Sequence, residues 1–268
     1  EAWDRGATEV CVQGGLPREL DGFHYRDILR AIRRAVPRIH IHAFSPMEVM
    51  YGVERTGMPL ADYLAMLKAE GLDSLPGTAA EILDDSVRQL LSRHKVTVRQ
   101  WVDVITTAHR LGIPTTSTMM YGHVERPEHW VNQLCLLRDI QRETGGFTEF
   151  VPLGFIHQNT HVYREGRARP GPTAGEHLRV HALARLMLQG RIDNIQVSWV
   201  KLGRALSQRC LQAGANDYSG TLMEENISRL AGATAGEYLA PEELRARIRE
   251  LGRTPAERST TYRLLRVF

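Results

Sequence analysis

Short apolar runs along this chain alternate with longer stretches in which apolar residues recur at helical spacing. The clearest run begins at Ile113, is apolar and β-branched, and predicts a buried strand. A polar turn that ends at Glu125 follows it, and Pro127 then suits the first turn of a helix. Strand, polar turn and helix is the unit with which α/β enzymes present reactive side chains at the carboxyl ends of their strands.

The same pattern before and after this stretch predicts six strands that alternate with helices. The strands are expected at residues 8–13, 39–44, 72–75, 113–120, 147–153 and 194–199. The helices are expected at residues 23–36, 59–70, 85–91, 97–111, 127–143, 173–188, 203–213, 224–230 and 241–251. Capping boxes begin two of these helices, at Thr97 and Thr173.

Regular alternation of strands and helices predicts an α/β fold with a parallel sheet and right-handed crossovers. A doubly wound sheet and a (β/α) barrel both fit this pattern. The barrel is favoured because the chain has neither a GxGxxG fingerprint nor a Walker loop. We expect one barrel domain over residues 1–268, with a C-terminal helical extension from about residue 220 to residue 268.

Composition restricts the function without naming it. The chain has 268 residues, of which 43% are hydrophobic and 24% charged, as in an ordinary globular protein. The net charge of +3 is small and no basic block is present, so charge gives no reason to expect nucleic acid or an anionic membrane as partner. No apolar run is long enough to span a bilayer, and three scattered cysteines form no disulfide framework. We therefore expect a cytoplasmic protein.

Histidines suggest one possible chemistry. His40 and His42 are two apart on a predicted strand, so they share a face and would point into a barrel. His123, His157 and His161 follow later strands, as does an aspartate at position 217. This set resembles the ligands of a metal-dependent barrel hydrolase. The alternative is that these histidines are hydrogen-bonded core or pocket residues.

Glycines and acids near strand ends suggest a ligand site. Gly14 and Gly15 follow the first strand, where a missing side chain lets a ligand approach the backbone, although on this observation alone a tight turn is the favoured explanation. Three acids would converge at one mouth if their strands are parallel, and each alone could be a solvated loop charge. They are Glu48, Glu125 and Glu149.

Six segments resemble the radical S-adenosylmethionine (SAM) enzymes of deazaflavin and menaquinone biosynthesis. The segments are EVCVQGG at 9–15, HAFSPME at 42–48, LPGTAAEIL at 75–83, TSTMMYGHVE at 116–125, GFTEFVPL at 146–153 and GAND at 214–217. The resemblance is strongest to the tyrosine-using subunit or half of deazaflavin synthase. The menaquinone-branch enzymes share fewer of these segments, and remain the alternative.

The resemblance implies a fold and a reaction. The fold is a partial TIM-type barrel of the radical SAM kind, and the cofactors are SAM and a 4Fe-4S cluster. The implied substrates are L-tyrosine and 5-amino-6-(D-ribitylamino)uracil. The 4-hydroxybenzyl part of tyrosine is joined to the uracil, and a glycine-derived imine leaves. A partner radical SAM subunit or fused half then closes the deazaflavin ring, and an electron donor is required.

The resemblance also assigns residues. The residues expected to bind SAM are Gly14, Gly15, Ser45, Glu48, Thr78, Glu81, Ser117 and Tyr121. The residues expected to act in catalysis are Glu125, His123 and Glu149, and those expected to bind substrate are His42, Gln196 and Asn216.

One departure from the family is plain. The family holds its cluster with a CxxxCxxC motif after the first strand, and this sequence contains none. We therefore expect no cluster ligand, and no other metal ligand, in this chain. Because the chain begins at Glu1 without a methionine, we expect it to be a piece of a longer protein whose first strand and cluster loop lie upstream, and to be inactive alone.

Overall fold

The computed structural model describes residues 1–223, 225 and 227–268, and they divide into two compact units. Unit 1 comprises Glu1–Ala80, His94–Ser117 and Ile140–Thr148. Unit 2 comprises Glu81–Arg93, Thr118–Asp139 and Glu149–Phe268. The single domain expected from the sequence stays a prediction.

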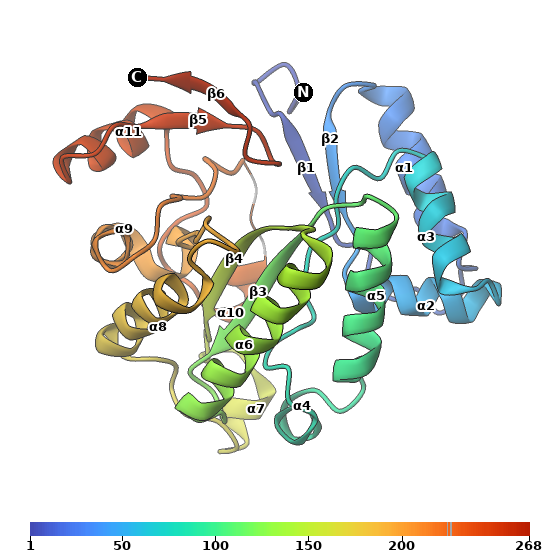
Figure 1. Ribbon diagram of the computed structural model, residues 1–268, viewed down its shortest axis with the longest axis horizontal. Coiled ribbons are helices and arrows are strands. Elements are labelled where there is room, and N and C mark those ends of the chain that lie inside the picture. The colour runs from blue at the N-terminus through green and yellow to red at the C-terminus, as the bar shows by residue number, and fades with distance from the viewer. Residues whose placement is uncertain (224, 226) are drawn as a thin grey trace. The chain divides into compact units, whose positions relative to one another are not determined.

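Unit 1 is built on parallel strand pairing. β1 (Glu9–Val12) pairs in parallel with β2 (His40–Ala43), His42 forms a parallel bridge to Ser74, and Leu75 forms one to Thr115. The helices are α1 (His24–Ala35), α2 (Pro46–Thr56), α3 (Leu60–Ala69) and α5 (Val98–Arg110). Contacts join α2, α3 and α5 to one another and α1 to α3, and Figure 1 shows α1 and α3 side by side. Their apolar faces bury the core of the unit, including Leu29, Leu64 and Trp101.

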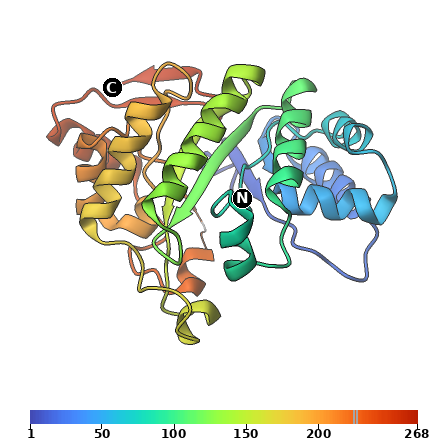
Figure 2. The same cartoon turned by 60° about the horizontal axis from the view of Figure 1, so that its bottom comes forward.

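Unit 2 continues the same pattern. Phe150 and Ile195 form a parallel bridge, and so do Gln196 and Asp217. The helices lying entirely in this unit are α4 (Asp85–Leu91), α7 (His161–Arg164), α8 (Ala174–Leu188), α9 (Trp199–Gln212), α10 (Ile227–Ala231) and α11 (Pro241–Glu250). α8 packs against α9 (Figure 2). The chain ends in a hairpin of β5 (Ala256–Arg258) and β6 (Leu264–Val267), which are antiparallel.

Three elements contribute residues to both units. They are β3 (Thr115–Tyr121), α6 (Pro127–Thr144) and β4 (Phe147–Gly154). β3 pairs with β4. In unit 1 the Thr115 N–H donates to the Gly146 oxygen, and in unit 2 the Phe155 N–H donates to the Tyr121 oxygen, so both strands run in the same direction. The predicted α/β fold with parallel strands is confirmed.

Several elements differ from the sequence-based prediction. The strands expected at 72–75 and 194–199 are reduced to isolated bridges. The start of the helix expected at 224–230 lies outside the described residues, and α10 begins at Ile227. α2 was not predicted, and neither was the β5–β6 hairpin, which replaces part of the expected helical extension. In α9 the helix is interrupted at Gly203, whose φ is 69°.

Candidate functional site

The glycine turn after β1 is held by an acid of α2. The Gly15 N–H donates to Glu48 Oε1 at 3.0 Å, and Tyr25 donates its hydroxyl to the Gly15 oxygen at 2.5 Å. Glu48 Oε2 accepts from the N–H and the hydroxyl of Ser45, at 2.6 and 2.7 Å. Ser45 in turn caps α2, and Pro46 occupies its first turn. Both of these predicted SAM residues are thus buried: Glu48 holds the Gly15 backbone, and Ser45 holds the Glu48 carboxylate.

Gly15 itself leaves space beside the backbone. Its φ is +68°, and a Cβ built on it would meet no heavy atom within 4 Å. Gly14 is tighter, because a Cβ there would lie 3.3 Å from the Tyr25 ring. A ligand could therefore approach the chain at Gly15 and not at Gly14.

The two histidines of β2 meet on one hydroxyl. His40 Nε2 and His42 Nδ1 each lie 2.7 Å from the oxygen of Ser74. Ile41 and Ala43, on the other face, are fully buried. This matches the expectation that the histidines share the face opposite the apolar one. Burial lowers the pKa of His40, so its imidazole is neutral near pH 7.

The turn at Gly77 and Thr78 is close-packed and contains an unpaired hydroxyl. The Gly77 N–H donates to Thr116 Oγ1 at 3.0 Å, and a Cβ at Gly77 would lie 2.0 Å from the Thr116 oxygen. Trp101 donates its indole N–H to the Thr78 oxygen at 3.1 Å. The Thr78 hydroxyl is buried without a hydrogen-bond partner. Because buried polar atoms are normally paired, this hydroxyl is available to a ligand.

The turn after β3 is organised by Glu125. Its carboxylate accepts from the N–H groups of Gly122 and His123, at 2.6 and 2.8 Å. It also accepts from Trp130 Nε1 at 3.1 Å and lies 3.5 Å from a guanidinium nitrogen of Arg169. The side chain is fully buried. Glu125 therefore braces the turn as Glu48 braces the turn after β1.

Electrostatics keep Glu125 ionised beside a neutral histidine. Burial lowers the pKa of His123 more than Glu125 raises it. The neutral ring accepts the Val124 N–H at Nδ1 and donates from Nε2 to the Met120 oxygen. Burial opposes the charge of Glu125, but His123 and the backbone N–H groups favour it, so the pKa of this carboxyl lies below its ordinary value. Because His123 is neutral, we attribute the effect to the backbone donors.

Arg169 ties a distant loop to this turn. The backbone N–H of Arg169 donates to the backbone oxygen of His123 at 3.1 Å. Its guanidinium forms an ion pair with Glu176, in the first turn of α8, at 2.8 Å. The ion pair lowers the pKa of Glu176 to about 2. The same loop places Pro172 against Gly122, where a Cβ would lie 2.3 Å from the proline ring.

The remaining predicted SAM residues are Ser117, Tyr121 and Glu81. Tyr121 directly precedes the turn, and its ring centroid lies 6.0 Å from that of Trp130. Ser117 and Tyr121 alternate along β3 on a fully buried face, and the Tyr121 hydroxyl lies 2.6 Å from Nδ1 of His177 on α8. Burial raises the pKa of Tyr121 well above its ordinary value. Glu81 has a φ of 39° and lies 3.4 Å from Arg88. Their roles in SAM binding stay predictions.

Glu149 and the predicted substrate residues of unit 2 have contacts that do not include the turn of Glu125. Glu149 is the third residue of β4, so it lies toward the amino end of that strand, whereas Glu125 follows the carboxyl end of β3. Glu149 accepts from Gln196 Nε2 at 2.9 Å. Asn216 is exposed, and its Oδ1 accepts from the Ile195 N–H and from Arg185. The structure brings Glu149 and Gln196 together, and does not bring Glu149 to the turn of Glu125.

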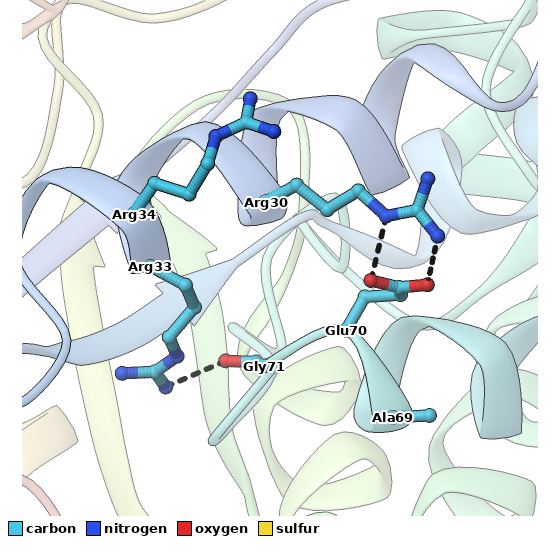
Figure 3. A pocket seen from close by; sticks show the side chains of 6 residues that line it. All are labelled: Arg30, Arg33, Arg34, Ala69, Glu70 and Gly71. Carbon is cyan, nitrogen blue, oxygen red and sulfur yellow. Dashed lines mark hydrogen bonds and ion pairs between the residues drawn. The ribbon is translucent and has the colours of Figure 1, made fainter.

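A surface pocket of about 350 Å³ in unit 1 contains none of these residues. It is lined by Arg30, Arg33, Arg34, Ala69, Glu70 and Gly71. Arg30 forms two hydrogen bonds to the Glu70 carboxylate, and Arg33 donates to the Gly71 oxygen at 2.7 Å (Figure 3). These contacts join α1 to the end of α3, which gives them a structural role.

The part of the chain that the structure describes contains no group of three His, Cys, Asp or Glu side chains that could hold a metal ion. The geometry therefore gives the hydrolase alternative no support. The cysteines differ in exposure and form no disulfide: Cys11 is exposed, Cys135 intermediate and Cys210 buried. Within the described residues, no helix is both long and apolar enough to cross a membrane.

Comparison with solved structures identifies the fold. The crystal structure of methylornithine synthase matches with a TM-score of 0.68 over 93% of this chain and 69% of that chain, at 16% identity. The expected fold class, an α/β fold of the partial (β/α) barrel type, is confirmed.

Comparison with protein sequences identifies the family. The model of a protein family described as CofH/MqnC C-terminal region matches residues 144–267. The 5-amino-6-(D-ribitylamino)uracil–L-tyrosine 4-hydroxyphenyl transferase of Methanothermobacter thermautotrophicus is 54% identical over 98% of this chain and 72% of its own length. The chain belongs to this transferase family. The enzyme of the same name from Methanocaldococcus jannaschii is 51% identical over 99% of this chain and 75% of its own length.

The chain matches only part of a longer relative. The FO synthase of Nocardia farcinica is 56% identical over 98% of this chain, which spans 30% of that protein. The chain thus spans less than a third of the FO synthase and about three quarters of the two transferases.

Some residues of the site were not found from the sequence. Trp130 and Arg169 hold Glu125, and Arg258 and Tyr262 surround Glu149. None lies in a motif that would mark it. An indole or guanidinium group that pairs with a buried carboxylate through tertiary contact leaves no local signal in sequence.

Proposed function

We propose that this chain forms the body of a radical SAM transferase that joins the 4-hydroxybenzyl part of L-tyrosine to 5-amino-6-(D-ribitylamino)uracil in deazaflavin biosynthesis. The observation that supports it is the identity of 51% and 54% to two transferases of that name across nearly the whole chain. Identity of 56% to an FO synthase supports the deazaflavin branch over the menaquinone alternative.

The proposal includes a partner. The FO synthase holds this chain's counterpart in 30% of its length. The rest of such a protein has room for the half that closes the deazaflavin ring. For a free-standing enzyme, the same task falls to a second radical SAM subunit. An electron donor and a cytoplasmic location also belong to the proposal.

The cofactors are SAM and a 4Fe-4S cluster, and this chain fits only the first. The described cysteines do not gather, so they provide no ligand set for a cluster, which normally needs clustered thiolates. SAM is supported by two features of unit 1, the open space at Gly15 and the buried, unpaired hydroxyl of Thr78. When bound, SAM supplies the radical chemistry of the family.

The residues of this chain then have definite tasks. Glu48 holds the turn at which Gly15 admits the ligand, and the Thr78 hydroxyl offers it a hydrogen bond. In unit 2, Glu125 and Arg169 hold the polar backbone of the turn after β3 in one conformation. Such preorganisation lowers the cost of binding and of orienting substrate.

A substitution at Gly15 tests the site. Asparagine tolerates a positive φ, so Gly15→Asn adds a side chain without disturbing the turn. Gly57→Asn is the matched control, because Gly57 in the same unit also has φ +68° and nothing within 4 Å of its Cβ position. In the complete enzyme, the Gly15 variant should bind SAM at least about tenfold more weakly, which corresponds to about 1.4 kcal/mol.

Two measurements keep the outcomes apart. Equilibrium binding of SAM tests the site, and mass spectrometry of the tyrosine–uracil adduct tests the reaction. If Gly15→Asn binds SAM as Gly57→Asn does, the glycine turn is not the cofactor site. If the complete wild-type enzyme consumes SAM but forms no adduct from tyrosine and the uracil, the proposed reaction is wrong.

A further inference from the structure

Three neighbouring segments of unit 2 present a polar floor, which we define as Glu149, Gln196 and Asp217. Their strands are linked by parallel bridges, one of them between Gln196 and Asp217. Glu149 and Asp217 are only 7% and 8% exposed, although both are acids. Buried acids require partners, and the C-terminal hairpin, β5–β6, provides them.

Two side chains of the hairpin cover the floor. Arg258 donates from Nε to Asp217 Oδ2 at 2.5 Å, and its guanidinium also lies 3.8 Å from Glu149. Tyr262 donates its hydroxyl to Glu149 Oε2 at 2.5 Å. The Arg258 guanidinium lies over the Tyr262 ring, 4.2 Å from its centroid. Arg258 and Tyr262 therefore cover the floor together, and the guanidinium, the phenol ring and the two carboxylates contact one another.

Tyr262 is held in an unusual backbone conformation. Its φ is +62°, a region that glycine and asparagine adopt readily and aromatic residues rarely do. The turn is fixed by the Tyr262 N–H, which donates to the Ser259 oxygen, and by the Ser259 N–H, which donates to the Arg263 oxygen. A strained residue persists where its side chain has a task that the favoured residue could not perform. The side chain held in this way is the Tyr262 phenol, whose hydroxyl contacts Glu149.

The position of the floor suggests the task. Glu149 lies toward the amino end of β4, whereas the active sites of parallel β/α folds lie at the carboxyl ends of the strands. We propose that the C-terminal hairpin is a seal, in which the Tyr262 ring closes the amino end of the strands and keeps water and small solutes away from the reaction. This inference rests on the proposed function, since a radical reaction needs such exclusion.

Three variants test the seal in the complete enzyme. Tyr262→Gly removes the ring and relieves the backbone strain, so the turn should still form. Tyr262→Phe keeps the ring and removes only the hydroxyl. Arg263→Gln, at the exposed neighbouring position, is the control. Hydrogen exchange of residues 147–154 and 194–199 measures solvent access without catalysis, and SAM consumed per adduct formed measures coupling.

We expect Tyr262→Gly to raise exchange in both segments and to raise SAM consumption per adduct severalfold. Tyr262→Phe and Arg263→Gln should remain near the wild type. A folded Tyr262→Gly variant with wild-type exchange and coupling would overturn the proposal. So would a Tyr262→Phe variant as uncoupled as Tyr262→Gly, because the hydroxyl rather than closure would then matter. If Tyr262→Gly and Tyr262→Asn both fail to fold, the hairpin is a folding element and not a seal. A wild type that makes no adduct refutes the proposed reaction, while hydrogen exchange still tests the seal.

Discussion

Glu125→Gln should destabilise the protein because the carboxylate it replaces is an acceptor only. In the wild type the two oxygens accept two backbone N–H groups and one indole N–H, at 2.6–3.1 Å, within a fully buried site. A glutamine amide has one oxygen and one NH₂ group, so at least one donor of the turn would face another donor. The Arg169 guanidinium would keep Glu176 and lose its contact with position 125.

The magnitude follows from these contacts. A hydrogen bond to a charged group contributes about 1.5–3 kcal/mol, and a buried donor left unpaired costs about 1–3 kcal/mol. The loss of the charge and of one pairing together predicts a decrease of about 3 kcal/mol in the free energy of unfolding. Most single substitutions cost less, so this value distinguishes a brace from an ordinary surface acid.

Urea unfolding followed by circular dichroism measures this change, and Glu128→Gln is the matched control. Glu128 lies in the first turn of α6, its side chain is 68% exposed, and its carboxylate lies 3.7 Å from the guanidinium of Arg126. An exposed pair of this kind contributes about 0–1 kcal/mol. If both variants unfold at the same urea concentration, the carboxylate of Glu125 does not hold the turn and the reasoning fails.

Three further predictions concern pH, packing and metal. The free energy of unfolding should fall as pH drops from 6.5 to about 4. The reason is that His109, His177 and His181 are buried and have a pKa of about 4 in the folded protein, so the unfolded chain binds protons more readily. In acid unfolding, His181→Asn should reduce this loss of stability. Gly77→Ala should lower the melting temperature because its Cβ would lie 2.0 Å from the Thr116 oxygen. Gly175→Ala, in the first turn of α8, should raise the melting temperature because its Cβ would have only a 3.9 Å contact. If calorimetry gives the reverse order, the close packing at Gly77 is contradicted. Anaerobic reconstitution of this chain alone with iron and sulfide should leave no iron after desalting, since its cysteines do not gather, and stoichiometric iron with cluster absorbance would refute this.

Local signals predicted most of the fold. The capping boxes at Thr97 and Thr173 begin α5 and α8 as expected, because both partners of each box lie within one helical turn. The same signal at Ser45, followed by Pro46, begins α2, a helix absent from the prediction, in which Ser45 is expected only as a ligand contact. A capping box predicts a helix whether or not its residues bind anything.

The hairpin and the partners of the acids were beyond local signals. The β5–β6 turn contains no Asn-Gly or Asp-Gly pair, and the residue with positive φ is a tyrosine, which no turn rule selects. Arg169 lies 44 residues from Glu125, so this pairing depends on tertiary structure, whereas Trp130 lies five residues from Glu125 and its pairing is local. Candidate site residues near strand ends could therefore be predicted from the sequence. Their hydrogen-bond and ion-pair partners from distant parts of the chain could not.

The two acids that follow strands have one common role. Glu48 accepts the N–H of Gly15, and Glu125 accepts the N–H of Gly122. Each carboxylate is buried and fixes a glycine turn at which the backbone has a positive φ. An acid already committed to backbone donors is poorly placed to transfer a proton, because protonation would break the bonds that hold its turn. The groups free to meet a ligand are then those that these turns present, such as the open backbone at Gly15, and the acids contribute by keeping the turns in place.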